Sequence, residues 1–331
     1  MKNLLLFDYC VDASNKWVHI FNSVSGVEWQ AKYKVLNCYH GSIWKNCLRY
    51  LGYFMLPLSV VVRRKQWHQI VGVQQFFALN FAFWCRLFHL KKVNEVIVLT
   101  FIYKRRKGFV GDMYHTYMRY MVESRYVDKL VVFSHEECRY YASIFKNCEN
   151  KFVFTPYGIE PVSIDDIADE GFLFAAGRSN RNYDFMLNML SDSSYNVKIA
   201  CDSYHKKVKD DHIQILTNCY GNDMLKIMAK CHCVLVPLED LNISSGQLVI
   251  LQAMSLGKPV VCTDADGIKD YVNHGVTGYV VDNDVNEWKR CLKQLNDNLL
   301  YEKMAKAAKS EFIANYTRTA MLERVARICT I

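Results

Sequence analysis

Apolar and polar positions form a clear block pattern in the second half of the chain. An apolar run at 234–236 predicts a buried strand, followed by a polar loop and then a helix that begins at 244–246 and ends at Gly257. Pro259 stands directly before the next apolar run, where it can start a strand without removing an interior ladder hydrogen bond. The pattern therefore predicts strand, loop, helix and strand in succession.

Similar blocks recur along the rest of the chain. Short apolar runs predict further strands at 3–8, 95–102, 130–134, 152–155, 172–175, 197–200, 213–216, 260–263 and 278–281. Longer amphipathic segments between them predict helices at 17–24, 183–190, 224–230, 268–272, 288–299 and 301–314. Because strands and helices alternate, we expect an α/β protein built from doubly wound parallel sheets.

The length of 331 residues indicates two domains, each able to bury its own core. A polar, acidic stretch at 160–170 has the composition of a linker. We therefore expect one Rossmann-like domain at 1–160 and another at 161–314, facing each other across a cleft. A C-terminal helix at 315–331 is expected to cross back to the first domain. Half of the residues are hydrophobic, so the composition is that of a folded protein rather than a disordered one.

Two long uncharged runs occupy 50–62 and 69–85. Both are shorter than the roughly 20 apolar residues that cross a bilayer, so neither is expected to span a membrane. Their ordinary interpretation is a core helix and strand. The alternative is an interfacial surface, indicated by cations and aromatic side chains close to the two runs, namely Arg63, Arg64, Lys65, Phe83, Trp84 and Phe88.

The formal charge of +8 is concentrated in the first half of the chain. Residues 1–160 carry 22 Lys and Arg against 11 Asp and Glu, whereas 161–331 carry 19 against 22. A basic half can meet nucleic acid, an anionic membrane or a phosphorylated substrate, and charge alone does not choose among them. The densest run, Lys104, Arg105, Arg106 and Lys107, follows a predicted strand, where parallel sheets bind ligands. A solvated loop is the ordinary interpretation, and an acceptor or membrane site is the functional one.

The 13 cysteines lack CxxC pairs, and the apolar run at the start of the chain is too short for a signal peptide. We therefore expect reduced thiols and a cytoplasmic protein. Cys231 and Cys233 flank His232, but this spacing is not that of a zinc site. No metal is expected.

Phosphate chemistry is indicated at two points of the second half. Gly177 and Arg178 follow a predicted strand, and a guanidinium there suits phosphate oxygens. The helix opened by Ser244, Ser245 and Gly246 exposes backbone N–H groups that can hold an anion, although an ordinary capped helix has the same pattern. The dinucleotide fingerprint GxGxxG is missing near the first strand, which weighs against a simple NAD or FAD enzyme.

Five segments in order resemble the retaining glycosyltransferases of family 4, which have the GT-B fold. They read PYGIE (156–160), AAGRSNRNYDFML (175–187), VLVPLED (234–240), SSGQLVILQAMSLGKPVV (244–261) and DADGIKDYVNHGVTGYVV (264–281). The resemblance covers about half of the chain. It implies a nucleotide-sugar donor whose diphosphate lies against Arg178, helped by Arg181, and against the helix that starts at Ser244, Ser245, Gly246 and Gln247.

This chain departs from the family at two functional positions. The family's paired glutamates, one on the donor sugar and one on the ribose, fall on Ser244 and Gln252, which can hydrogen-bond hydroxyl groups but carry no charge. The place of a sugar-contacting histidine holds Ile102, Tyr103 and Lys104, and His115 is a substitute to consider. The base is expected near Cys219 and Tyr220, with Cys201 and Asp202 as further candidates. Asp266 and Asp270 have the spacing of a helix start, where capping is the ordinary role.

The resemblance implies a glycosyltransferase that moves a sugar from a UDP- or GDP-linked donor, with retention, to a glycan or lipid-linked acceptor in cell-surface polysaccharide assembly. Arg178 and backbone amides would stabilise the departing diphosphate, so neither a cofactor nor a metal is expected. Peripheral attachment to the inner face of the membrane is part of this expectation. The alternatives are a GT-B sugar-nucleotide 2-epimerase and a catalytically inactive partner subunit. Nucleic acid is disfavoured, because the cations form no continuous stripe interleaved with aromatics.

Overall fold

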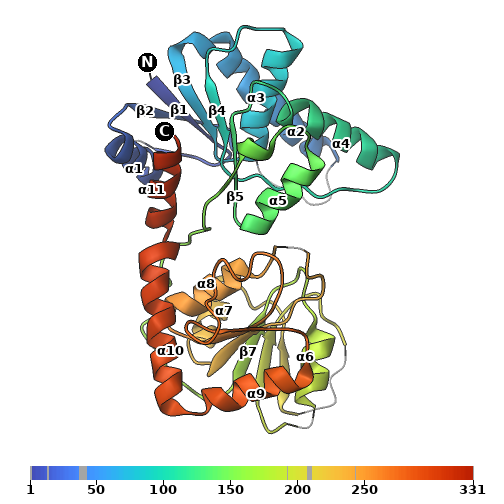
Figure 1. Cartoon of the computed structure of the whole chain (residues 1–331), viewed down its shortest axis with the longest axis vertical. Helices are drawn as coiled ribbons and strands as arrows, with labels where there is room; N and C mark the ends of the chain where they lie inside the picture. The colour runs from blue at the N-terminus through green and yellow to red at the C-terminus, as the bar shows by residue number, and fades with distance from the viewer. Residues whose placement is uncertain are drawn as a thin grey trace. The chain divides into compact units, whose positions relative to one another are not determined.

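The computed structural model of the chain describes residues 2–12, 15–36, 43–191, 193–206, 211–242 and 244–330. It divides into two compact units (Figure 1). The first comprises Met1–Thr155 together with Leu322–Ile331, and the second comprises Pro156–Met321. Each unit is described separately below.

The first unit is a six-stranded parallel sheet in the order β2-β1-β3-β4-β5-β6. Its strands are β1 (Lys2–Phe7), β2 (Trp29–Tyr33), β3 (Trp67–Gly72), β4 (Glu95–Val98), β5 (Lys129–Val132) and β6 (Phe152–Phe154). Its helices are α1 (Lys16–Ser25), α2 (Ile43–Val62), α3 (Gln75–Leu87), α4 (Phe109–Val122) and α5 (His135–Ile144), with short 3₁₀ turns at Arg64–Gln66 and Glu149–Lys151. The strands β1, β3, β4 and β5 are buried over most of their length because both faces of a parallel sheet are covered.

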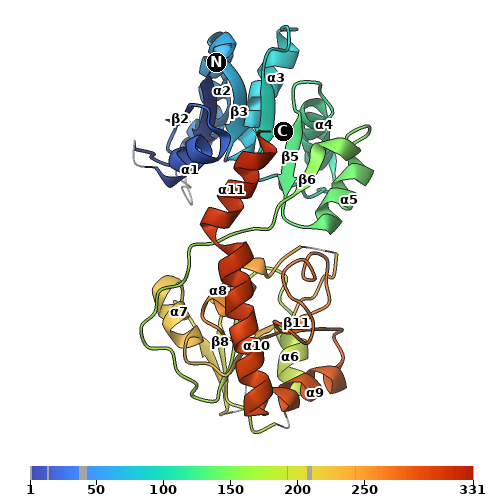
Figure 2. The same cartoon turned by 60° about the vertical axis from the view of Figure 1, so that its left-hand side comes forward.

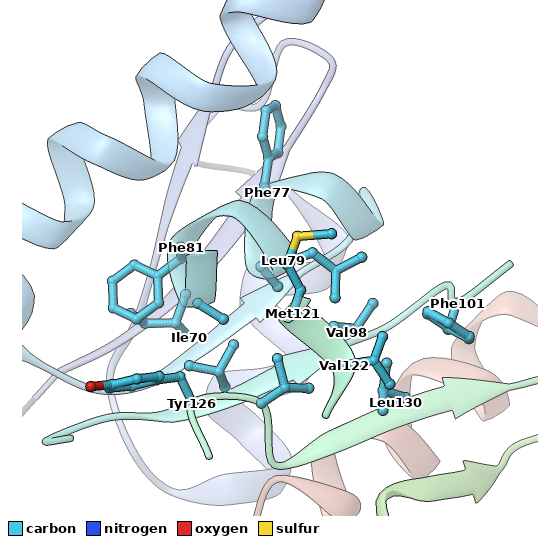
Figure 3. Close-up of a cluster of buried hydrophobic side chains, with 14 of the residues drawn as sticks. Ile70, Phe77, Leu79, Phe81, Val98, Phe101, Met121, Val122, Tyr126 and Leu130 are labelled. Carbon is cyan, nitrogen blue, oxygen red and sulfur yellow. The ribbon is translucent and has the colours of Figure 1, made fainter. Parts of the chain in front are cut away.

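The core of the first unit lies between the sheet and the helices α3 and α4 (Figure 3). Strand side chains meet helix side chains in this layer, among them Ile70, Val98 and Leu130 from the sheet and Phe81, Met121 and Val122 from the helices. Helix starts are fixed by local caps. Ser134 Oγ accepts the Glu137 N–H (3.0 Å) ahead of α5, so the chain turns into the helix directly after β5.

The second unit has another six-stranded parallel sheet, in the order β12-β11-β10-β7-β8-β9. Its strands are β7 (Leu173–Ala176), β8 (Val197–Ala200), β9 (Ile213–Leu216), β10 (Cys233–Val236), β11 (Val260–Thr263) and β12 (Tyr279–Val281). Its helices are α6 (Tyr183–Leu190), α7 (Gly221–Met228), α8 (Gln247–Ser255), α9 (Val285–Leu295) and α10 (Asn298–Glu311), followed by a π-helical turn at Phe312–Tyr316. Counted from β7, this is the 3-2-1-4-5-6 order of a Rossmann domain. The predicted α/β class with two doubly wound domains is confirmed.

The boundary between the units lies at 155/156, five residues before the position expected from the acidic stretch. The segment 156–160 belongs to the second unit because it pairs with the end of that unit. Ile159 N–H donates to the Tyr316 carbonyl (3.0 Å), and Arg318 N–H donates to the Ile159 carbonyl (2.7 Å). The last helix, α11 (Arg318–Ile328), follows α10 (Figure 2) and begins in the second unit.

The C-terminal segment from Leu322 belongs to the first unit, rather than the whole range 315–331. Lys129 Nζ donates to the Ile328 carbonyl (2.6 Å), and the buried Gln69 amide donates to the Cys329 carbonyl. The partners of this segment thus come from the sheet strands β3 and β5. Buried carbonyls at a helix end need such donors, because the last turn has no intrahelical partner.

Two predicted elements differ from the structure, whereas the two uncharged runs agree with it. The helix expected at 268–272 is a series of turns, since Gly267 has a positive φ of 77° and Tyr271 N–H bonds back only three residues, to Ile268. The uncharged run 50–62 forms the second part of the helix α2, and the run 69–85 holds the end of β3 and most of α3, so the two runs are helix and strand as expected. The strand expected at 95–102 ends at Val98, although Phe101 beyond it remains buried.

Candidate functional site

The strand order of the second unit reverses between β7 and β10. These two strands are hydrogen-bonded neighbours, with Leu235 paired to Ala175, and the chain leaves them in opposite directions across the sheet. Loops at the carboxyl ends on either side of such a switch point form the usual ligand site of an open α/β sheet. Here those loops are 177–182 after β7 and, in the described ranges, 237–242 and 244–246 after β10.

Gly177 and Arg181 shape the loop after β7. Gly177 has φ 116°, and a Cβ at this position would lie 2.7 Å from an Nη of Arg181, so only glycine fits both the backbone and the guanidinium. Arg181 Nε donates to the Ala176 carbonyl and Nη1 to the Ser179 carbonyl, both at 2.9 Å. Burial lowers the pKa of Arg181. Two of its three nitrogens therefore brace the loop, and its help with phosphate stays a prediction.

Arg178 differs from Arg181 in its surroundings. Its side chain is exposed, and among the residues that the structure describes its guanidinium has no partner. It follows β7 by two residues, at the carboxyl edge of the sheet. Arg178 is therefore available for a ligand, as a phosphate contact requires.

Asn180 ties the two loops together, a role that the sequence analysis missed. Its Nδ2 donates to the Asp240 carbonyl (2.8 Å) and to Ser245 Oγ (2.9 Å), while its Oδ1 accepts the Asp240 N–H (2.7 Å). Asn180 also has a positive φ of 55°, a conformation that asparagine tolerates better than most residues. The sequence signal was an asparagine inside a short strand-to-helix loop, but its partners are 60 and 65 residues away.

The start of α8 is not capped by the serine pair as expected. The N-cap is Gly246, with no side-chain cap bond, because each serine is engaged elsewhere. Ser244 Oγ accepts from the Gln247 side-chain amide, and Ser245 Oγ accepts from Asn180. Ile250 N–H donates to the Gly246 carbonyl (3.0 Å), so the amides just before Ile250 precede the helical ladder, where an anion can be bound.

Gly246 is required by both its conformation and its surroundings. Its φ is 94°, and an added Cβ would lie 3.0 Å from Val236 Cγ1. The helix start is thus pressed against the end of β10. The rest of α8 is apolar on nearly every side and buried, which fixes the direction of its axis.

Gln252 lies near the middle of α8. Its Oε1 is buried and has no hydrogen-bond partner within the described part of the chain. A buried acceptor without a donor is costly, by about 1–3 kcal/mol. A ligand with hydroxyl donors would satisfy it, and the resemblance places a ribose at this position.

The residues predicted to hold the base lie at the ends of β8 and β9. Asp202 Oδ1 accepts the Asn218 N–H (2.6 Å), which joins the two loops after these strands. Cys219 is half-buried against the core, and Tyr220, the residue before α7, is 69% exposed. Cys201 is buried at the end of β8. An exposed ring at this edge suits stacking, and the assignment of the base to Tyr220 and Cys219 stays a prediction.

The two aspartates considered as caps lie in the turns after β11. Asp266 N–H donates to the Leu241 carbonyl (2.7 Å), and the Asp270 carbonyl accepts from the Tyr316 hydroxyl (3.1 Å). Neither stands at a helix start, because this segment is not helical.

The remaining predicted residues belong to the first unit, in and after the loop that follows β4. Lys104, Arg105, Arg106 and Lys107 are all exposed. His115 lies on α4, and its Nδ1 is 2.7 Å from the hydroxyl of the buried Tyr103. Burial, with the nearby Arg105 and Arg119, lowers the pKa of His115.

Neither a metal cluster nor a membrane span is found in the described ranges. No group of three or more His, Cys, Asp or Glu side chains there is arranged to hold a metal ion. Cys231 and Cys233 are buried, and His232 Nδ1 pairs with Asp169 (2.7 Å). No helix of this part of the chain combines the length and apolar composition needed to cross a bilayer.

Comparison with known proteins shows similarity to glycosyltransferases. Residues 171–298 match the family model described as glycosyl transferases group 1. An uncharacterized glycosyltransferase of Methanocaldococcus jannaschii is 23% identical over 165 residues, which are 46% of this chain and 46% of that protein. The match thus spans about half the length of this curated relative.

Solved structures extend the similarity to the whole chain. A glycosyltransferase from Rickettsia africae superposes with a TM-score of 0.67 at 14% identity, covering 99% of this chain and 97% of that one. Anabaena HepE in complex with UDP gives 0.67 at 14%, covering 100% of both. Sucrose-phosphate synthase of Thermosynechococcus elongatus gives 0.69 at 12%, covering 99% and 98%.

These similarities establish the GT-B fold, with two Rossmann-like domains. The family match lies in the second unit and includes both loops at the switch point. Together they support a glycosyltransferase of GT-B fold.

Proposed function

We propose that the chain transfers a sugar from a nucleotide-sugar to a glycan or lipid-linked acceptor, with retention of the anomeric configuration. The observation that carries the proposal is the Asn180 bridge, which holds the loop after β7 against the start of α8 at the switch point. A diphosphate bound there would meet the exposed Arg178 and the amides of 245–247. UDP is the favoured nucleotide, because Anabaena HepE binds UDP and UDP-glucose.

Catalysis on this proposal is electrostatic stabilisation of the leaving group. As the bond from the sugar to the diphosphate breaks, negative charge grows on the phosphate oxygens. Arg178 and the backbone N–H groups before Ile250 would balance that charge without moving far. The acceptor hydroxyl forms the new bond to the anomeric carbon, and its proton passes to an oxygen of the departing diphosphate. Retention is inferred from the family resemblance.

Recognition of the nucleoside is assigned to two further places. Gln252 would direct its buried, unpaired Oε1 to a ribose hydroxyl, and Tyr220 would stack on the base. The chain holds Ser244 where the family has a carboxylate, so we expect the donor sugar to be held by hydrogen bonds without a charge. Ser244 Oγ already accepts from Gln247, which orients both side chains toward one another.

Peripheral membrane association is proposed from the first unit. Lys104, Arg105, Arg106 and Lys107 form an exposed cationic loop, which suits the anionic inner face of a membrane. The helix α2 adds apolar side chains at successive turns, namely the exposed Trp44, Leu48, Leu51 and Met55. The spacing i, i+4, i+7, i+11 keeps them on one face, as in interfacial helices. The associated role is assembly of a cell-surface polysaccharide.

An inactive partner subunit is the second candidate, favoured by Ser244 and Gln252 in place of the two family glutamates. A panel of UDP- and GDP-sugars, screened by thermal shift and then for release of free nucleotide, separates the two. The enzyme is expected to be stabilised by at least one donor and to release its nucleotide when acceptor is supplied. Binding without release would favour the inactive subunit, and absence of binding to every donor would exclude the transferase.

A further inference from the structure

The first unit carries a groove on the outer side of its helices. It has a volume of about 520 Å³ and is lined by Phe83 of α3 and by Phe109, Met113, Thr116, Tyr117 and Tyr120 of α4. The two helices pack against each other, and both contribute side chains to the core beside the sheet (Figure 3). The volume is within the range of ligand sites, and the lining is almost wholly apolar. The groove therefore suits a hydrocarbon ligand rather than a sugar.

The aromatic rings on one side of the groove pack against each other, whereas the side chains at the start of α4 are exposed. Phe83 packs against Tyr117 and Tyr120 with ring centroids 6.0 and 5.7 Å apart. At the start of α4, in contrast, the side chain of Phe109 is 80% exposed and that of Met113 is 59% exposed. Large apolar side chains gathered beside an apolar groove mark a binding surface.

Positive charge lies in the segment just before α4, whose first residue, Phe109, lines the groove. The loop 104–107 runs into α4, which begins at Phe109. Asp112 lines the groove, but its carboxylate is paired with Arg105 (2.6 Å), so it does not repel an anion there. Lys104 and Lys107 are exposed and, among the described residues, have no partner. An apolar groove close to exposed cations is complementary to an amphiphile with a negatively charged headgroup.

We propose that this groove binds the hydrocarbon chain of a phosphate-bearing lipid, with the phosphate at Lys104 and Lys107. The inference rests on the proposed function and narrows its acceptor class to lipid phosphates. The hydrocarbon chain of the lipid would cover Phe109 and Met113 and remove their side chains from water, while the cations would bind the phosphate headgroup. The acceptor hydroxyl groups would lie on the far side of the phosphate, away from the groove.

Binding of dodecyl phosphate below its micelle concentration tests the proposal on the full chain by isothermal titration calorimetry. The double variant Phe109→Ser/Met113→Ser is expected to lose affinity by at least roughly tenfold, because two apolar contacts are removed. Its matched control is Leu299→Ser/Ile313→Ser, which removes two exposed apolar side chains of the second unit. The control should bind like the parent protein.

A second pair of variants tests the headgroup. Lys104→Glu/Lys107→Glu should weaken dodecyl phosphate binding by about tenfold, whereas Lys289→Glu/Lys303→Glu on the exposed surface of α9 and α10 should not. Inorganic phosphate should bind far more weakly than dodecyl phosphate to the parent protein. Equal affinity for the two probes would show that the hydrocarbon chain contributes nothing to binding and would overturn the proposal.

Two outcomes separate this proposal from the alternatives. Binding to phosphatidylglycerol vesicles without binding to monomeric dodecyl phosphate would mean adsorption to a surface, and the groove assignment would be wrong. UDP-sugar stabilisation is measured on every variant and is expected to be unchanged. If the parent protein binds dodecyl phosphate but no nucleotide-sugar, the groove stands as a lipid site while the proposed transferase function fails.

Discussion

Nδ2 of Asn180 lies 2.9 Å from Oγ of Ser245, although the two residues are 65 positions apart in the chain. This bond and the paired bonds to the Asp240 backbone join the loop after β7 to the loop that leads into α8. The backbone of Asn180 has a positive φ at this position. The proposed diphosphate site is thus held in shape by a residue that need not touch the ligand.

Asn180→Ala should lower both stability and donor affinity. The variant loses the side-chain hydrogen bonds and places alanine at a left-handed backbone position, at a cost of about 2 kcal/mol. Asn147→Ala is the control, because Asn147 has a similar φ of 53° in the first unit. It should cost about 1 kcal/mol in urea unfolding and leave nucleotide-sugar affinity unchanged. Equal donor affinity for Asn180→Ala and the parent would remove the bridge from the account.

Gly246→Ala tests whether the start of α8 must lie close to β10. The substitution adds a methyl group 3.0 Å from Val236 Cγ1 at a φ of 94°. Gly275→Ala carries only the backbone cost, since its φ is 77° and no atom lies within 4 Å of the added Cβ. Urea unfolding should show Gly246→Ala to be the more destabilising by at least about 1 kcal/mol. Equal losses would mean that the helix start shifts freely.

The fold was largely predictable because parallel strands buried on both faces leave uninterrupted apolar runs, as at β7 and β10. The site was predictable only in part. Gly177 and Gly246 can be recognised in the sequence because each is a glycine in a predicted loop. The hydrogen bond from Asn180 to Ser245, in contrast, depends on two loops that only the folded sheet brings together. The serine pair has the pattern of a helix cap, yet Gly246 takes the cap position, and the two serine hydroxyl groups accept from Gln247 and Asn180 instead.

Gln252→Met should raise the melting temperature of the ligand-free protein slightly or leave it unchanged. Methionine has a similar volume and removes a buried acceptor that has no partner in the described structure, which is a gain of up to about 1 kcal/mol. The melting-point shift produced by a nucleotide-sugar should fall. Gln294→Met, at an exposed position of α9, is the control. A full ligand shift in Gln252→Met would show that Oε1 does not contact the donor.

His115 makes stability depend on pH in a known direction. Its pKa is lowered in the folded protein by burial and by Arg105 and Arg119, so the unfolded chain takes up the proton first as the pH falls. The free energy of unfolding therefore has its full value, as far as His115 is concerned, above the usual histidine pKa of about 6.5. It declines as the pH falls below that value toward the lower pKa of the folded protein. Urea unfolding at about pH 7.5 and pH 5 should show a smaller acid loss in His115→Gln than in the parent. His19→Gln, on an exposed position of α1, is the control, and an unchanged acid loss in His115→Gln would contradict the assignment.

The central claim is that a nucleotide diphosphate is bound between the loop after β7 and the start of α8. Calorimetric titration of UDP into the parent, Arg178→Ala and Arg290→Ala proteins tests it most directly, because both arginines are exposed and only Arg178 lies at the switch point. Arg178→Ala should bind UDP at least about tenfold more weakly, since a charge-assisted hydrogen bond is lost, while Arg290→Ala should bind like the parent. Equal UDP affinity in all three proteins would contradict the account.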